Sequence, residues 1–205
     1  PQRIVPGGFT KIPTVAQLKG LRERILAAEG DLAAFENLLK ALAPKLPNFT
    51  RETEYVALKD KREYALYDGD IASSLGDTAP VSDYLSWTNE YLVPQSTAKY
   101  TKRRKDSLMV GALARYNINH AQLGSRAKKT AANLGLAAPC YNPYMNSVAQ
   151  FVEVIDFLDS AVALIDELLK RGLKEEQFKV TPKAGRGVGA TEVPRGILFH
   201  DYTYD

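Results

Sequence analysis

Two long segments of the chain carry apolar residues at alternating spacings of three and four, and this pattern constrains the fold more than any other feature. The first segment spans residues 14–43, with Leu18, Leu21, Ile25, Ala28, Leu32, Phe35, Leu39 and Leu42 on one stripe. The second spans about residues 146–171, with Val148, Phe151, Ile155, Leu158, Val162, Ile165 and Leu169. Each stripe predicts an amphipathic helix, and two matching stripes are most simply buried against each other.

Residues 54–75 have a different pattern, which predicts a small sheet. Residues 54–59 alternate loosely, residues 64–67 read as a second strand before the Asp68-Gly69-Asp70 turn signal, and residues 71–75 can pair back. We therefore predict a mainly α fold: long antiparallel helices in a bundle, with this small β-sheet at one end.

Shorter elements are predicted between and after the long helices. A short helix is expected from Pro80 to Tyr91, and another over about residues 119–134 with Gly135 as its C-terminal stop. The stretch from Val180 to Asp205 is glycine-rich and then strand-like.

The composition is that of an ordinary globular protein. The chain has 205 residues, 45% of them hydrophobic and 25% charged, which suits one domain over residues 1–205. A net charge of +3 is too small to demand a nucleic-acid partner. No run of about 18 apolar residues occurs, so no membrane span is expected. Both ends read as cuts through a longer protein.

Cysteine and histidine are scarce, which narrows the possible chemistry. The single cysteine, Cys140, excludes an internal disulfide and a Cys-x-x-Cys site, and His120 and His200 are the two histidines. A zinc or iron site built from this chain alone would have to depend on carboxylates. We interpret Cys140, His120 and His200 as structural by default.

Two local motifs could bind phosphate. In Gly185-Arg186-Gly187-Val188-Gly189 the glycines could let backbone amides approach an anion, but no helix follows, so a tight turn is favoured. The basic run over residues 99–105 contains five cations. On a nearly neutral chain such a run is usually a solvated segment.

The stretch Glu192-Val193-Pro194-Arg195-Gly196 is more distinctive. Proline between an extended residue and an arginine, followed by glycine, makes a rigid kink that presents one permanently charged guanidinium. The alternative is a buried Glu192–Arg195 pair that holds a turn together. The chemistry of the residues leaves these two interpretations even.

These residues resemble the large subunit of nickel–iron hydrogenases, most closely the cytoplasmic, cofactor-reducing type. Residues 187–202 resemble the family signature Gly-x-Glu-Ala-Pro-Arg-Gly-x-Leu-x-His-x-Tyr, with Val193 in place of its alanine. Further matches are Pro1, Pro6-Gly7-Gly8-Phe9, Val110-Gly111-Ala112-Leu113-Ala114-Arg115-Tyr116-Asn117 and Asn142-Pro143-Tyr144. The resemblance extends from the first residue to the last.

The resemblance implies an outer-shell role for the Pro-Arg motif. In the family, this proline and arginine stand above the nickel–iron centre, near the iron's diatomic ligands; carried over, they are Pro194 and Arg195. Glu192 and His200 match supporting positions. The family's two metal-binding Cys-x-x-Cys pairs are missing here, so we expect this chain to bind no metal or other cofactor and to be inactive alone.

Three functions follow as hypotheses. The leading one is a central fragment of a hydrogenase large subunit, cytoplasmic, whose intact form catalyses reversible hydrogen oxidation with an iron–sulfur small subunit. The second is a metal-free scaffold or assembly module related to that family. The third, a nucleic-acid binder using residues 99–105, is disfavoured by the weak charge. Exposed surfaces of a fragment also predict self-association.

Overall fold

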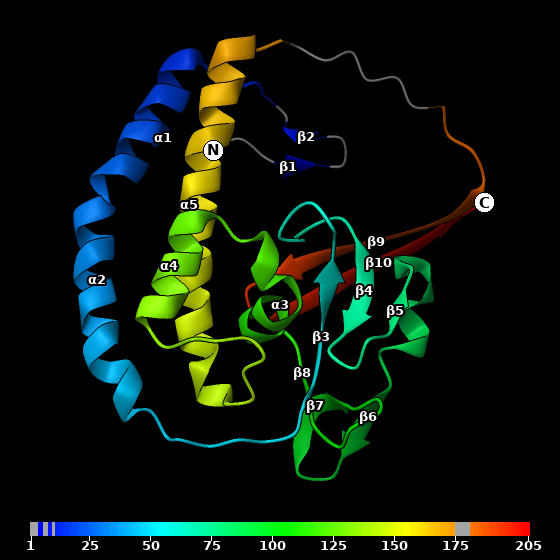
Figure 1. Cartoon of the computed structure of the whole chain (residues 1–205). Helices are drawn as coiled ribbons and strands as arrows, with labels where there is room; N and C mark the ends of the chain where they lie inside the picture. The colour runs from blue at the N-terminus through cyan, green and yellow to red at the C-terminus, as the bar shows by residue number, and fades with distance from the viewer. Residues whose placement is uncertain (1–3, 6–7, 10, 175–180) are drawn as a thin grey trace.

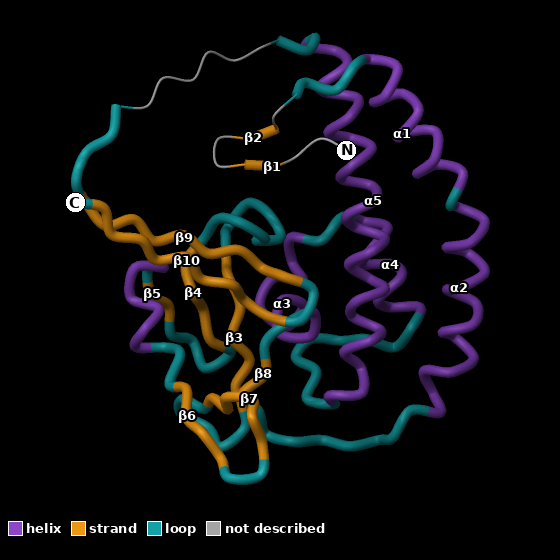
Figure 2. Tube along the Cα trace, turned by 180° about the vertical axis from the view of Figure 1, so that it is seen from behind, coloured by secondary structure: helices purple, strands orange, loops and turns teal. Residues whose placement is uncertain are grey.

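Helices gather on one side of the molecule and strands on the other (Figures 1 and 2). The computed structural model describes residues 4–5, 8–9, 11–174 and 181–205. Pro1, Pro6 and Gly7, which contribute to the resemblance noted above, lie outside the described residues.

The described helices are of two kinds, α-helices and short 3-10 helices. The α-helices are α1 (Val15–Ala27), α2 (Glu29–Leu42), α3 (Ala112–Asn119), α4 (Ser125–Asn133) and α5 (Asn146–Arg171). The 3-10 helices are η1 (Ala43–Lys45), η2 (Val81–Ser86), η3 (His120–Gln122) and η4 (Pro143–Met145). Among the described helices, none combines the length and the apolar character needed to cross a membrane.

The described strands form several small sheets. They are β1 (Ile4–Val5), β2 (Gly8–Phe9), β3 (Glu54–Lys59), β4 (Asp70–Ser73), β5 (Thr78–Ala79), β6 (Glu90–Val93), β7 (Ser96–Thr101), β8 (Leu108–Met109), β9 (Gly185–Val193) and β10 (Gly196–Tyr204). One sheet has the order β5-β4-β3-β8, in which only the β3–β8 pair is parallel. The pairs β1–β2, β6–β7 and β9–β10 are antiparallel hairpins.

The prediction of a mainly α bundle with one small sheet is wrong, because the fold is mixed α/β. The predicted sheet at residues 54–75 exists as β3 and β4. The β6–β7 hairpin adds strands that the sequence pattern did not predict, whereas the strand-like character of the last residues is confirmed by the β9–β10 hairpin. The β6–β7 strands were missed because most of their side chains are exposed, which removes the apolar alternation that marks a strand.

The packing of the two long helical segments is confirmed. Phe35 of α2 contacts Phe151 near the start of α5, with ring centroids 5.2 Å apart. Arg22 of α1 binds Asp166 near the end of α5, with Nε 2.7 Å from Oδ1. The earlier residue of the first segment, Arg22, contacts the later residue of α5, and the later residue, Phe35, contacts the earlier one. The two segments therefore run antiparallel, as Figure 1 shows.

Strand β3 lies between two apolar cores. Tyr55 and Ala57 point into a core built mainly from α3, α4 and α5. Val56 and Leu58 point the other way, into a smaller core that includes Trp87 and is covered by side chains of β9 and β10. Successive side chains of a strand alternate between its two faces, so β3 joins the helical layer to the sheets.

Several local predictions differ from the structure. Residues 64–67 form a loop instead of a strand, and the predicted helix over 119–134 is interrupted by η3 and Gly124 before α4. Gly135 does end α4, at φ +73°. The glycine-rich residues 185–189, expected as a tight turn, are extended and paired along β10.

Candidate functional site

The Pro194–Arg195 pair forms the tip of the β9–β10 hairpin. Val193 pairs with Gly196 in the ladder, which leaves Pro194 and Arg195 as the two turn residues, both exposed. Proline fixes its own φ and has no N–H to satisfy, so it suits this position. The tip therefore presents the Arg195 guanidinium outward on a stiff hairpin.

A buried guanidinium lies directly beneath this tip. Arg115 of α3 is only 2% exposed, although it carries a permanent charge. Its Nε and Nη2 atoms bind the two carboxylate oxygens of Glu153 at 2.6 and 2.8 Å. Its Nη1 atom lies 3.0 Å from Oε2 of Glu192. One cation is therefore shared by two buried carboxylates, and the Tyr64 hydroxyl donates a further hydrogen bond to Glu153 at 2.8 Å.

The same guanidinium also binds the backbone of the tip. Nη1 donates to the carbonyl oxygen of Val193 at 2.7 Å, and Nη2 donates to that of Pro194 at 3.2 Å. A guanidinium has five N–H donors, and the five bonds of Arg115 to Glu153, Glu192 and these two carbonyls use all of them.

Burial and the charges of this cluster together shift the pKa values of its members. Burial raises the pKa of Glu192 to about 7, and the amide of Leu58 and the charge of Arg115 offset this only in part. Burial alone would lower the pKa of Arg115, but its bonds to the two carboxylates outweigh burial and raise it. Burial, and then the nearby Glu153 charge, raise the pKa of the Tyr64 hydroxyl. Glu153 receives two Arg115 bonds and Glu192 one, so Glu192 is the less well compensated carboxylate.

Two glycines allow the hairpin tip to approach α3. Gly111, which precedes α3, has φ +89°, and a Cβ placed on it would lie 3.2 Å from the carbonyl carbon of Arg195. A Cβ on Gly196 would lie 3.2 Å from a methyl group of Val110. At Gly111, only glycine combines a positive φ with so close a contact. Gly111 and Arg115, one helical turn apart, thus hold the tip from the same helix.

The predicted site residues do not all meet. Glu192 lies under the tip, but its partner is Arg115, so the hypothesis of a Glu192–Arg195 pair is wrong. His200 lies four residues along β10 from Gly196, about 13 Å at the usual rise per residue. It is exposed, and its Nδ1 atom lies 3.0 Å from the Tyr202 hydroxyl. The Glu192 side chain therefore lies beneath the turn formed by Pro194 and Arg195, whereas His200 lies away from that turn.

Sequence reasoning missed Arg115 and Glu153 as members of the site. The signal was present for Arg115, a single charge that directly follows the small apolar residues 110–114 at the start of α3. Such a residue can be buried only with a partner. Glu153 lies on the apolar side of α5 and is buried, which makes it the matching signal on the second helix.

A pocket of about 330 Å³ opens beside this cluster. Its polar lining comes from Arg115, Glu153, Glu192 and Gln150, and its apolar lining includes Phe157 and Pro194. The buried charges are therefore not sealed inside the core, because one side of the cluster faces this cavity.

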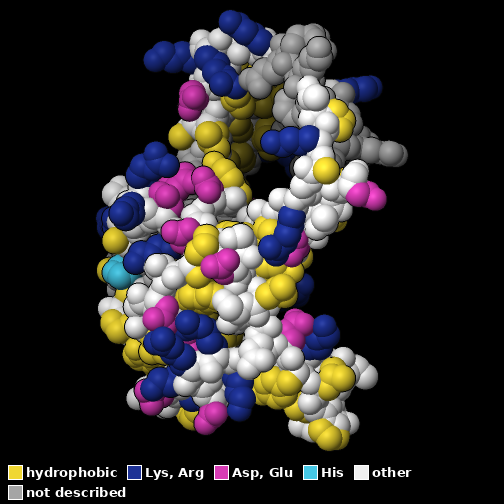
Figure 3. Space-filling model, turned by 90° about the vertical axis from the view of Figure 1, so that its right-hand side faces the viewer, with side chains coloured by type: hydrophobic (Ala, Val, Ile, Leu, Met, Phe, Trp, Pro, Cys, Tyr) yellow, Lys and Arg dark blue, Asp and Glu magenta, His cyan; other side chains and the backbone are white. Residues whose placement is uncertain are grey.

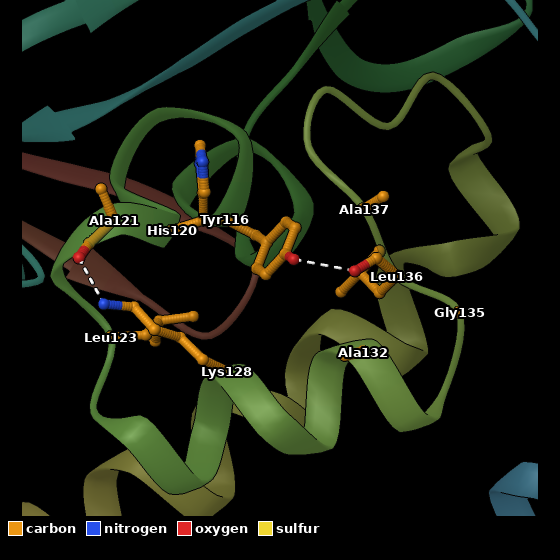
Figure 4. Close-up of a pocket in the computed structure, with 9 residues that line it drawn as sticks. All are labelled: Tyr116, His120, Ala121, Leu123, Lys128, Ala132, Gly135, Leu136 and Ala137. Atoms are coloured by element: carbon orange, nitrogen blue, oxygen red, sulfur yellow. Dashed lines mark hydrogen bonds between the residues drawn. The ribbon is translucent and has the colours of Figure 1, made fainter.

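His120 lines a different pocket, of about 400 Å³, between η3 and α4 (Figure 4). The Tyr116 hydroxyl donates to the carbonyl of Leu136 at 2.9 Å, and Lys128 donates to the carbonyl of Ala121 at 2.7 Å. The Tyr116 hydroxyl and the Lys128 ammonium thus already have backbone partners, and His120 is the remaining polar side chain among the residues that line the pocket.

The positive charges of the basic run over residues 99–105 are compensated by carboxylates of the same chain. Its five cations, Lys99, Lys102, Arg103, Arg104 and Lys105, each pair with a carboxylate. Arg103 is the most buried of them. It binds the fully buried Glu54 at 2.6 Å and stacks on the Trp87 ring, 3.9 Å from the centroid.

Metal-ligating groups do not cluster in the part of the chain that the structure describes: no group of three or more His, Cys, Asp or Glu side chains could hold a metal ion there. Cys140 is half-buried, and its backbone exchanges two hydrogen bonds with the Asn117 side chain, at 2.8 and 2.9 Å. The donor chemistry of the described residues therefore does not fit a resident nickel–iron centre.

Comparison with known proteins agrees with the resemblance seen in the sequence. The chain is 31% identical over 202 residues to the alpha subunit of sulfhydrogenase 1 of Pyrococcus furiosus, a match that covers 97% of this chain and 46% of the relative. The chain is a homologue of hydrogenase large subunits. The alpha subunit of sulfhydrogenase 2 from the same organism is 27% identical over 114 residues, covering 56% of this chain and 28% of the relative. No family model matches the chain.

Solved structures share the fold. An NAD+-reducing nickel–iron hydrogenase has a TM-score of 0.73 and 24% identity, covering 98% of this chain and 49% of that one. The nickel–iron–selenium hydrogenase of D. vulgaris Hildenborough has a TM-score of 0.57 and 19% identity, covering 96% of this chain and 50% of that one. The chain thus spans about half the length of these two hydrogenase structures.

Proposed function

We propose that this chain is a central segment of a hydrogenase large subunit and that the intact protein catalyses reversible hydrogen oxidation. The observation that carries the proposal is the hairpin tip, where Arg195 is presented outward above a buried charge cluster. The named relatives are hydrogenase subunits, which supports the same reaction. A cytoplasmic location, a single domain and an iron–sulfur small subunit as partner belong to this proposal.

Within this proposal, the metal ligands come from segments other than the described residues. What this chain contributes is a fixed cation: a guanidinium does not lose its proton at physiological pH, and its planar fork donates hydrogen bonds in set directions. Held on a stiff tip, Arg195 stabilises negative charge that develops on a group above it without reorganising. Pro194 limits the conformations of the tip, and Glu192 supports it from below.

The test is Arg195→Lys in the full-length subunit, assembled with its partner and assayed for hydrogen-dependent dye reduction per nickel. Lysine keeps the charge but loses the fork, so we expect turnover to fall by about a hundredfold or more, with nickel content unchanged. The matched control is Arg186→Lys. Arg186 is an exposed arginine on the same hairpin, paired with Asp201 at 2.7 Å, and its replacement should leave turnover unchanged.

Two results would contradict the proposal. Equal activity per nickel in Arg195→Lys would mean that Arg195 serves only to close a turn. A wild-type complex that assembles without nickel would instead favour the metal-free scaffold. For the 205-residue chain alone, we expect no nickel to remain after chelation, which elemental analysis can measure.

A further inference from the structure

The tip of the β9–β10 hairpin is anchored in an unusual way for an exposed turn. Turn carbonyls at a surface ordinarily bind water. Here the carbonyls of Val193 and Pro194 both accept hydrogen bonds from Arg115, a side chain from the helical layer that is 2% exposed. The exposed tip is thus tied to the interior by a charged group.

The two bonded carbonyls are consecutive, and this matters for Arg195. Each peptide group is planar, so a bond to its oxygen restrains the whole plane. Fixing the planes after Val193 and after Pro194 places the Cα of Arg195. The next peptide group, that of Arg195 itself, rests against Gly111, where a Cβ would come within 3.3 Å of its oxygen. Three successive peptide groups are therefore held in place.

Two carboxylates in turn fix the orientation of Arg115, which anchors the tip. Glu153 binds Arg115 through both oxygens, which sets the plane of the guanidinium. Glu192 binds it through Oε2 at 3.0 Å, while its Oε1 accepts the Leu58 amide of β3 at 2.7 Å. The anchor is thus oriented by α5 on one side and by β3 on the other.

We propose that Arg115 is a positioning residue that sets the height and direction of Arg195 through the carbonyls of Val193 and Pro194. For its activity readout the proposal rests on the proposed function, but the anchoring itself does not. Lysine at position 115 keeps the charge, yet its three donors cannot replace five bonds in a planar array. The tip should then move independently of α3.

The first measurement is hydrogen–deuterium exchange in the full-length complex, comparing wild type, Arg115→Lys and Arg103→Lys. Arg103→Lys is the matched control, because Arg103 is also ion-paired with a buried carboxylate but contacts Glu54 of β3, Asp77 and Trp87 instead of the tip. We expect Arg115→Lys to raise exchange at residues 193–198 by about tenfold, as local opening becomes easier. Arg103→Lys should leave those residues unchanged.

The second measurement is turnover per nickel in a double-mutant cycle. If Arg115 acts through Arg195, Arg115→Lys should lower turnover by about tenfold in the wild-type background and cause no further loss in Arg195→Lys, because coupled residues are not additive. A purely structural role predicts the same factor in both backgrounds. Additive losses, or unchanged exchange at the tip, would overturn the proposal.

Two further outcomes remain decisive. If the wild-type complex has no hydrogen-dependent activity but Arg115→Lys still loosens the tip, the proposed function fails and the anchoring stands. If Arg115→Lys does not fold, Glu192→Gln takes its place in both measurements, because it keeps the shape and the acceptor for Leu58 while weakening the bond to Arg115. Unchanged exchange at the tip of Glu192→Gln would then refute the anchoring.

Discussion

Glu192 should make the stability of the protein fall as pH rises towards 7. Its carboxyl is buried, it shares one guanidinium with Glu153, and burial raises its pKa from 4.5 to about 7. The groups that face it are Arg115 and Glu153 of the cluster and the amide of Leu58. Between these two pH values the folded protein holds a proton that the unfolded chain releases, so the folded state is favoured most at low pH.

The magnitude follows from the size of the shift. At pH 4 both states are largely protonated, and this group contributes little to the pH dependence. Above pH 7 both states are ionised, and the folded state bears the whole cost of keeping the charge buried. A difference between 4.5 and about 7 corresponds to about 3 kcal/mol of unfolding free energy, lost between these values.

Urea unfolding of wild type and Glu192→Gln at pH 4.5, 6 and 8 measures this loss. The variant cannot ionise at this position, so the free energy of wild type minus that of the variant should fall by about 3 kcal/mol from pH 4.5 to pH 8. Asp156, whose pKa burial also raises, is present in both proteins and cancels. A difference that stays constant, or that rises with pH, would show that Arg115 compensates Glu192 fully and refute the reasoning.

Three further predictions follow from other parts of the structure. Gly111→Ala should lower the unfolding free energy by about 1–3 kcal/mol more than Gly76→Ala, since both have left-handed φ but only Gly111 meets another residue; equal losses in urea unfolding would contradict this. Arg103→Met should cost about 3 kcal/mol, because it leaves the buried Glu54 without its cation, whereas Arg186→Met at an exposed pair should cost less than about 1 kcal/mol; similar calorimetric losses would argue against it. The 205-residue chain should self-associate through exposed apolar side chains such as Phe35, which is 47% exposed; a monomer at all concentrations in sedimentation would count against this.

The sequence predicted the long helices well because their patterns are long and their ends are marked. Helix α5 has the predicted bounds, and Gly172 follows its last residue. Thr14 forms a capping box with Gln17 at the start of α1. The first segment is nevertheless interrupted at Ala28, where ψ is −5° and the backbone N–H donates hydrogen bonds to the carbonyl oxygens of Ile25 and Leu26. Gly30, two residues on, weakens the helix there, an effect too local to disturb the apolar stripe.

The candidate site was predicted only where it is continuous in the chain. Pro194, Arg195 and Glu192 are neighbours in one motif, so the sequence could place them together. Arg115 and Glu153 lie 77 and 39 residues before Glu192, and their pairing depends on how α3 and α5 pack. The exposed β6–β7 hairpin was missed for a related reason, since its side chains carry no strong apolar pattern. Figure 3 shows apolar side chains on the surface at the level of the β6–β7 hairpin, including a group at the bottom of the view.

The double-sided burial of β3 has a consequence for how the molecule unfolds. Because Ala57 belongs to the core against the helices and Leu58 to the core against the hairpin, neither core can open while the other stays intact around this strand. The helical layer and the sheets should therefore melt together in one transition, with β3 amides exchanging only through global unfolding. Leu58 lies on a strand that is packed on both faces, so the strand cannot shift to make room for a different side chain there. We therefore expect this strand to tolerate fewer substitutions than the long helices around it.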